Sequence, residues 1–149
     1  MATEIIESLL AETSPSVQAH LGILQSVIQR MASNSTSCKT WCITVVSAIL
    51  VIVAGKGKPA FAFIALVPTF LFLALDAYYL ALEKAFRASY AEFVKKLHAG
   101  EAKAEDLYAI APQGSHSKHQ IEALRSFSVW GFYGTLLILI ELTRSVVLK

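Results

Sequence analysis

Three long apolar runs constrain this chain more than any other feature. A helix needs about 20 mostly apolar residues to cross a bilayer. Only 16% of the 149 residues are charged, whereas soluble domains carry about 25%. The sequence therefore predicts an all-α integral membrane protein, one domain over residues 1–149. Its membrane-spanning helices are expected at residues 38–54, 60–82 and 127–148.

The segment GKGKP at residues 55–59 separates the first two spans. Glycine and proline interrupt helices and favour turns. The first two spans are therefore expected to form an antiparallel hairpin. Pro68 lies inside the second span, and we expect a kink there, because membrane helices tolerate proline.

The distribution of lysine and arginine predicts the orientation of the hairpin. The positive-inside rule places the side with more basic residues in the cytoplasm. Here the counts are nine against four, so we expect a bacterial inner-membrane protein with a cytoplasmic N-terminus and a periplasmic C-terminus. The N-terminal residues are acidic, so no signal peptide is expected. The nine are Arg30, Lys39, Lys84, Arg87, Lys95, Lys96, Lys103, Lys118 and Arg125, and the four are Lys56, Lys58, Arg144 and Lys149.

Charged residues sit at matching distances from the centre of the hairpin. Lys39 and Asp76 lie on opposite sides of Gly57 and are almost equally far from it along the chain. Antiparallel helices bring such positions to about the same depth. We therefore expect Lys39 and Asp76 to pair. Two interpretations of Asp76 stay open, a structural pair that sets the hairpin register and a residue that lines an ion or proton path; we favour the first.

The same symmetry predicts that both helices continue beyond the membrane. Arg30 and Glu83 form a second candidate pair, because they too are almost equally far from the centre. Helices at residues 16–37 and 83–99 are expected to pack as a cytoplasmic antiparallel stalk, followed by a loop at residues 100–120. Ser14 and Pro15 are typical of a helix start, and Gly100 of a helix end. The polar stretch at residues 33–37 could break the first helix. The stalk pairing residues are expected to be Arg30, Glu83, Phe86, Arg87 and Phe93.

Glu141 and Arg144 form a second charged position, inside the third span. They are three residues apart on a helix, which allows them to pair on one face. One interpretation is a self-neutralised pair near the outer headgroups. The other is a ring of charge at the outer end of an oligomer.

Small residues follow one face of the first span and one face of the third. Such faces let membrane helices approach closely. They serve packing inside one chain or self-association, and three helices alone enclose no pore, so a conducting form would be a homo-oligomer. The small residues are Thr40, Thr44, Ser47 and Ala48 in the first span, and Ser128, Gly131, Gly134 and Thr135 in the third.

The chemistry-bearing residues do not form a recognisable catalytic motif, and we expect no enzyme activity and no cofactor. Cys38, Cys42, His116 and His119 could together approximate a two-cysteine, two-histidine zinc site. The histidine spacing is short, so we favour packing cysteines, solvated histidines and no bound metal. The net charge of +2 does not suggest a nucleic-acid partner.

Two motifs at the hairpin resemble those of a group of small, largely uncharacterised bacterial integral membrane proteins. The first, RMA.NS...K.W, begins at Arg30, and the second, P...F..LDAYYL..E..FR..Y, runs over residues 68–90. The resemblance implies a shared hairpin and names no activity. The residues that carry the resemblance are Arg30, Asn34, Lys39, Trp41, Asp76, Tyr78, Tyr79, Glu83, Phe86 and Arg87.

These observations lead to two functional hypotheses. The first is a self-associating inner-membrane protein that conducts ions or perturbs the membrane. In general type it is similar to the membrane effectors of antiphage defence, which suggests a defence or stress role by analogy of class. The second is a non-conducting membrane anchor whose stalk binds a partner protein.

Overall fold

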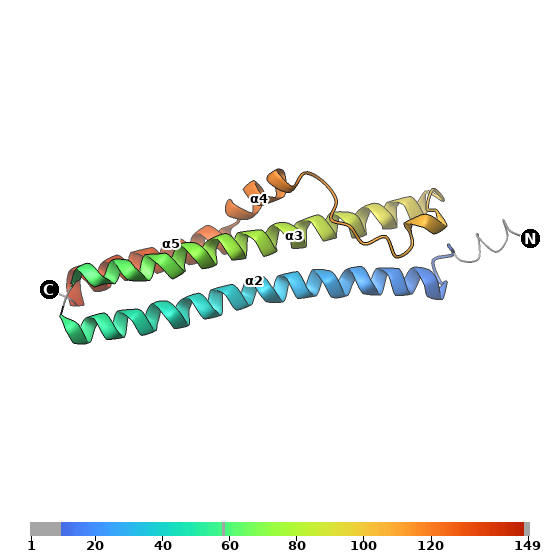
Figure 1. Cartoon of the computed structure of the whole chain (residues 1–149). Helices are drawn as coiled ribbons and strands as arrows, with labels where there is room; N and C mark the ends of the chain where they lie inside the picture. The colour runs from blue at the N-terminus through green and yellow to red at the C-terminus, as the bar shows by residue number, and fades with distance from the viewer. Residues whose placement is uncertain (1–9, 58, 148–149) are drawn as a thin grey trace, which may run out of the picture.

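Two long antiparallel helices form the frame of the molecule. The computed structural model describes residues 10–57 and 59–147, and every regular element in these ranges is helical. Helix α2 (Pro15–Lys56) and helix α3 (Leu66–His98) lie side by side along their length (Figure 1). Helix α5 (Phe127–Leu142) flanks the half of this hairpin near its turn, and α4 (His116–Leu124) lies near the middle of α3. The predicted all-helical fold is confirmed.

Three helical stretches are long and apolar enough to cross a membrane. They are Pro15–Lys56, Pro59–His98 and Phe127–Val146. The first two contain the predicted spans at residues 38–54 and 60–82. The third ends two residues before the expected end of the span at 127–148, and Leu148 lies outside the described residues. The basic residues Lys58 and Lys149 of the charge count lie outside them too, as does most of the acidic N-terminus.

Helix α2 is continuous for 42 residues, or about 63 Å at 1.5 Å per residue. The Ser14 hydroxyl caps it by accepting a hydrogen bond from the Val17 amide at 3.3 Å, with Pro15 in the first turn. The helix ends at Gly57, whose φ of 60° is one that glycine adopts without strain. The polar stretch at residues 33–37 does not break the helix. Within this stretch the Thr36 hydroxyl donates to the Ala32 carbonyl of the same helix at 3.2 Å, and Ser33 and Ser37 are exposed.

The second arm of the hairpin begins differently from the expectation. A 3₁₀ helix, η1 (Pro59–Ala65), precedes α3, so that Pro68 falls in the first turn of α3. A proline in the first turn removes no intrahelical hydrogen bond, because those amides have no partner four residues earlier. The predicted kink within the helix was therefore wrong. Helix α3 ends at His98, two residues before Gly100, as predicted.

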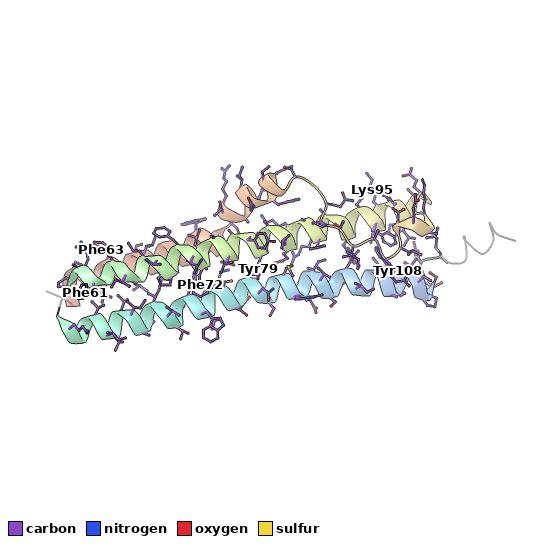
Figure 2. The ribbon with its side chains drawn as sticks, viewed as in Figure 1. Phe61, Phe63, Phe72, Tyr79, Lys95 and Tyr108 are labelled. Atoms are coloured by element: carbon purple, nitrogen blue, oxygen red, sulfur yellow. The ribbon has the colours of Figure 1, made fainter. Side chains whose placement is uncertain are left out.

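The half of the molecule near the turn has a three-helix core. Its buried residues come from α2, from η1 and from α5. In Figure 2, Phe72 lies in this half of the hairpin, while Phe61 and Phe63 lie at its closed end. In the described residues the other half consists of two long helices, residues 15–37 of α2 and 83–98 of α3, which we name the stalk. The buried cluster comprises Cys42, Val46, Ala65, Val129, Tyr133, Leu136 and Ile140.

The predicted loop at residues 100–120 was wrong in its second part. Residues 101–115, which we name the strap, contain a short 3₁₀ turn, η2 (Ala104–Asp106), and α4 then starts at His116. Helix α4 packs on α3 through Ala123, which is fully buried. A helix of nine residues is too short to form alone, so this tertiary contact stabilises it. A π-helical turn, η3 (Thr143–Val147), follows α5.

Candidate functional site

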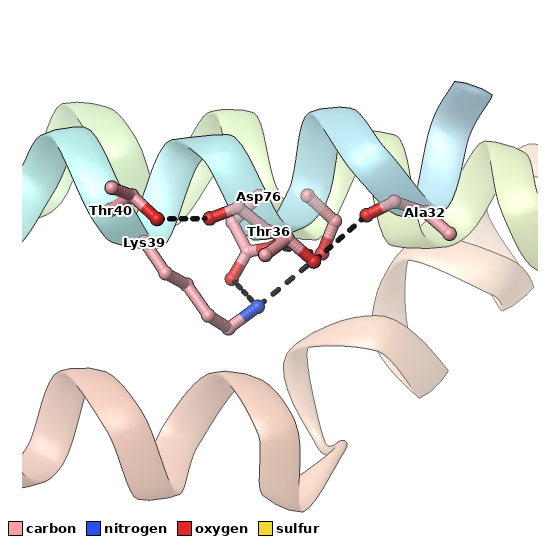
Figure 3. Close-up of polar contacts among 6 residues, drawn as sticks. Ala32, Thr36, Lys39, Thr40 and Asp76 are labelled. Carbon is pink, nitrogen blue, oxygen red and sulfur yellow. Dashed lines mark hydrogen bonds and ion pairs between the residues drawn. The ribbon is translucent and has the colours of Figure 1, made fainter. Parts of the chain in front are cut away.

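The centre of the candidate site is an ion pair between the two long helices. Lys39 Nζ on α2 lies 2.6 Å from Asp76 Oδ2 on α3 (Figure 3). The Asp76 side chain is fully buried, and the Lys39 side chain is 18% exposed. The predicted contact between these two residues is confirmed. It fixes the register of the hairpin, because a slip of one helix past the other would separate the charges.

Ser35 completes this charged cluster from the turn of α2 before Lys39. Its hydroxyl donates to Asp76 Oδ1 at 2.5 Å and accepts from Lys39 Nζ at 3.3 Å. Ser35 is buried, so its polar group needs these partners. Sequence reasoning missed this residue, because the polar stretch was read as a weak point of the helix. Its spacing of four from Lys39 on a helix face was the signal that could have found it.

The buried pair is stable as a pair and costly when broken. Two charges far from water are tolerated when they are matched and hydrogen-bonded, as here. Removal of one partner leaves the other charge uncompensated, at a cost of about 3–5 kcal/mol. The geometry therefore supports the structural interpretation of Asp76, as half of an ion pair that holds α2 and α3 in one register.

The third apolar helix reaches the same cluster through Tyr133. This side chain is buried, and its hydroxyl interacts with the Asp76 carboxylate. Cys38 and Cys42 are free thiols buried beside it. The cluster thus lies at the junction of all three apolar helices.

Among the described side chains no histidine joins the two cysteines, and the His116 side chain of the expected zinc site lies outside the described ones. No group of three or more His, Cys, Asp or Glu side chains there could hold a metal ion. The His119 ring contacts the Gln113 carbonyl oxygen at 3.0 Å and lies in α4 instead of a loop. The thiols instead pack in the interior of the helix bundle.

The second predicted pair, Arg30 with Glu83, was wrong. Glu83 pairs instead with Arg87 of its own helix, at 2.6 Å. Side chains four residues apart lie on the same face of a helix, so Glu83 can reach Arg87 without spanning the distance to α2. Of the expected stalk residues, Phe93 is buried and packs on the His20 ring at 4.3 Å between centroids, whereas Phe86 is half-buried.

Glu141 and Arg144 form the local pair that their spacing predicted. Arg144 Nε donates to Glu141 Oε2 at 2.9 Å, and both side chains are partly exposed. The Arg144 guanidinium also lies 5.1 Å from the centre of the Phe63 ring. This contact ties the end of α5 to η1 at the closed end of the hairpin.

The strap covers the stalk through contacts that sequence reasoning did not predict. The Tyr108 amide donates to His20 Nδ1 at 2.9 Å, and Lys96 pairs with Asp106 at 3.3 Å. Tyr108 itself has a φ of 63°, which is uncommon for a residue other than glycine. Burial lowers the pKa of His20, against the opposing charge of Asp106. No periodic pattern marks residues 101–115, so nothing local signalled these contacts.

The outward side of α2 carries a row of exposed hydroxyl residues, which we name the hydroxyl face: Thr36, Thr40, Thr44 and Ser47. Thr40 donates to the Thr36 carbonyl at 3.2 Å and Thr44 to the Thr40 carbonyl at 2.9 Å. Their hydrogens are used within the helix, so the oxygens are left to accept. Ser47 and the exposed Thr135 of α5 line one shallow groove between the two helices.

The fold and the site together define an all-helical chain with three membrane-length apolar helices around a buried ion pair. No protein-family model, curated protein or solved structure matches this chain.

Proposed function

We propose that this chain is a self-associating inner-membrane protein that conducts cations or perturbs the membrane. In this proposal all three apolar helices cross the bilayer, with the N-terminus and the stalk in the cytoplasm and the C-terminus in the periplasm. The excess of lysine and arginine on the stalk side supports this orientation. A role in antiphage defence or stress remains a prediction by analogy of class.

The observation that carries the proposal is the hydroxyl face. Lipid-facing surfaces are apolar, whereas this row of small, exposed hydroxyl residues runs from the end of the stalk into the first half of the apolar span of α2. Small hydroxyl residues favour close contact between membrane helices. One chain encloses no pore, so a path lined by this face requires several copies. Threonine oxygens that only accept would favour cations over anions in such a path.

The buried ion pair has a supporting role in this proposal. Lys39 and Asp76 neutralise one another inside each chain, away from the hydroxyl face. The pair therefore holds the hairpin that presents the face and does not itself carry ions. Charge changes at Asp76 are expected to act on conduction only through folding.

The membrane potential of cells that express the protein tests the proposal. A voltage-sensitive dye would report wild type, the double variant Thr40→Val/Thr44→Val and the control Ile52→Val at matched membrane levels. Valine keeps the threonine shape and removes the oxygen, and Ile52 is exposed but lies off the hydroxyl face. We expect depolarisation by wild type and by the control, and its loss in the double variant. Equal depolarisation by all three would refute a path lined by this face, and none by wild type would refute conduction.

The second candidate function is a membrane anchor whose stalk binds a partner protein. The stalk favours it, because α2 and α3 together extend well beyond the length that a bilayer needs. Phe93 cannot be part of such an interface, because it is buried inside the stalk. The exposed Ile23 of α2 offers a better position. Crosslinking in intact cells should then capture a heteromeric complex that Ile23→Glu abolishes, and recovery of no partner after gentle solubilisation would exclude this function.

A further inference from the structure

Helix α4 lies at the level where the apolar span of α5 begins. That span, Phe127–Val146, is 20 residues or about 30 Å long, which equals the hydrocarbon thickness of a bilayer. Once α5 crosses the membrane, Phe127 must therefore lie at the boundary and α4 just outside it. The Gln113 amide donates to the Ala85 carbonyl at 3.3 Å. Gln113 precedes α4 by three residues, so α4 starts beside α3, on the stalk side of the buried ion pair.

The free surface of α4 combines apolar and basic side chains with one exposed acid, Glu122, which lies 3.8 Å from His119 Nδ1. Ile121 and Leu124 are about half exposed, and Phe127 follows them with 75% of its surface free. Lys118 and Arg125 are exposed on the same side of the helix, and neither forms an ion pair within residues 10–57 and 59–147. Unpaired cations next to free apolar side chains form the pattern of a helix that lies on a membrane surface.

Two exposed tryptophans independently support the position of α4 at the membrane boundary. Trp130 follows one turn after Phe127 on α5, and Trp41 on α2 lies two residues from Lys39 of the buried pair. The Phe127 and Trp130 rings contact one another edge to face, at 5.2 Å between centroids. Tryptophan side chains concentrate at the level of lipid headgroups. Helices α2 and α5 therefore mark the same boundary at which α4 lies.

We propose that α4 lies in the membrane interface and that Lys118 and Arg125 bind the phosphates of anionic phospholipids. Ile121, Leu124 and Phe127 insert at the edge of the acyl chains, and the two cations hold headgroups beside them. The inference rests on the membrane insertion proposed above but not on ion conduction. Anionic headgroups fit better than zwitterionic ones, because a phosphatidylcholine phosphate already has its own cation. Each lysine or arginine near an anionic surface changes affinity by about fivefold.

Thermal unfolding of the full-length protein in neutral detergent micelles tests this site. Phosphatidylglycerol or phosphatidylcholine would be titrated in, and circular dichroism would follow the melting temperature. We expect phosphatidylglycerol to raise the melting temperature of wild type and phosphatidylcholine to have little effect. The half-saturating concentration should rise about 25-fold in Lys118→Gln/Arg125→Gln, while Lys118→Arg/Arg125→Lys should retain the wild-type response.

The control variant is Lys95→Gln, since Lys95 is also exposed and unpaired in the described part of the chain but projects from the stalk (Figure 2). It should respond like wild type. Equal responses of wild type and the double Gln variant, or equal effects of the two lipids, would overturn the proposal. The same stabilisation by inorganic phosphate or by polyglutamate would assign the surface to a free anion or an acidic protein segment, and would overturn the lipid assignment. Membrane fractionation tests insertion separately, so the two failures are distinguishable.

Discussion

Two buried carboxylates, one in each half of the hairpin, are satisfied in different ways. In the half near the turn, Asp76 is fully buried and finds its partner on the other helix. In the stalk, Glu83 pairs four residues along its own helix with Arg87, which is mostly exposed. The difference lies in the cationic partner. Lys39 is 18% exposed and reaches Asp76 across the gap between the helices, whereas Arg87 is 65% exposed and pairs with Glu83 from the solvent side of the same helix.

The halves also differ in the element that packs against the two long helices. Helix α5 packs on the half near the turn and buries Tyr133, Leu136 and Ile140 against α2 and η1. Among the described residues no third helix packs on the stalk, which is covered by the strap through a few polar contacts at His20, Ser89 and Lys96. We therefore expect the stalk to open under conditions that leave the other half folded.

The largest expected effect follows from breaking the buried pair. Asp76→Asn leaves the Lys39 charge without a counter-charge and should destabilise the protein by about 3–5 kcal/mol. The double variant Lys39→Met/Asp76→Leu should recover most of this loss, because apolar residues of similar volume replace a buried pair at little cost. Unfolding in a denaturing detergent, followed by circular dichroism, measures both. Equal losses in the single and the double variant would show that the charge pairing is not what stabilises the hairpin.

An intermediate effect is expected from pH at the strap. The pKa of His20 is lowered by burial, so the folded state favours the neutral ring, whose Nδ1 accepts from Tyr108. The unfolded stalk binds the proton more tightly, so this stability is present above pH 6.5 and is lost as the pH falls below it. Glu92 and Lys96 of α3 and Asp106 of the strap line the same cavity.

Limited proteolysis of the strap over a pH series would measure this opening. Cleavage of wild type should rise below pH 6.5, the ordinary pKa of histidine. The variant His20→Gln cannot gain the proton, so its cleavage should not change over the same interval. Asp106, whose pKa is lowered chiefly by the Lys103 amide, would weaken its contacts only in more acidic solution. Parallel pH dependence in wild type and His20→Gln would assign the effect to another group.

The smallest expected effect is at the local pair of the stalk. Glu83→Gln removes an ion pair within one helix and should cost about 0.2–0.5 kcal/mol. Its unfolding in the same detergent titration should therefore nearly coincide with that of wild type. A loss as large as that of Asp76→Asn would mean that the stalk depends on this charge as much as the other half depends on its buried pair.

Several features of the fold and site could be predicted because they depend on distances along one helix. The constant rise of an α-helix per residue places Lys39 and Asp76 at one depth, and their contact is present. The same arithmetic failed for Arg30 and Glu83, because it gives depth and not the direction in which a side chain points. Pro68 was misjudged for a related reason, since the start of α3 at Leu66 follows from the 3₁₀ helix before it.

The sequence by itself determined the helical class, the hairpin and the pair that sets its register. Apolar length, helix rise and turn residues are local properties that each segment carries with it. Only the tertiary structure decided that Ser35 completes the charged cluster, that α4 forms on α3 and that the strap bonds to His20. The Ser35–Asp76 hydrogen bond joins residues 41 positions apart, and the Tyr108–His20 hydrogen bond joins residues 88 positions apart. Such contacts depend on the rotation of packed helices and on the path of an irregular segment, which no local periodicity encodes.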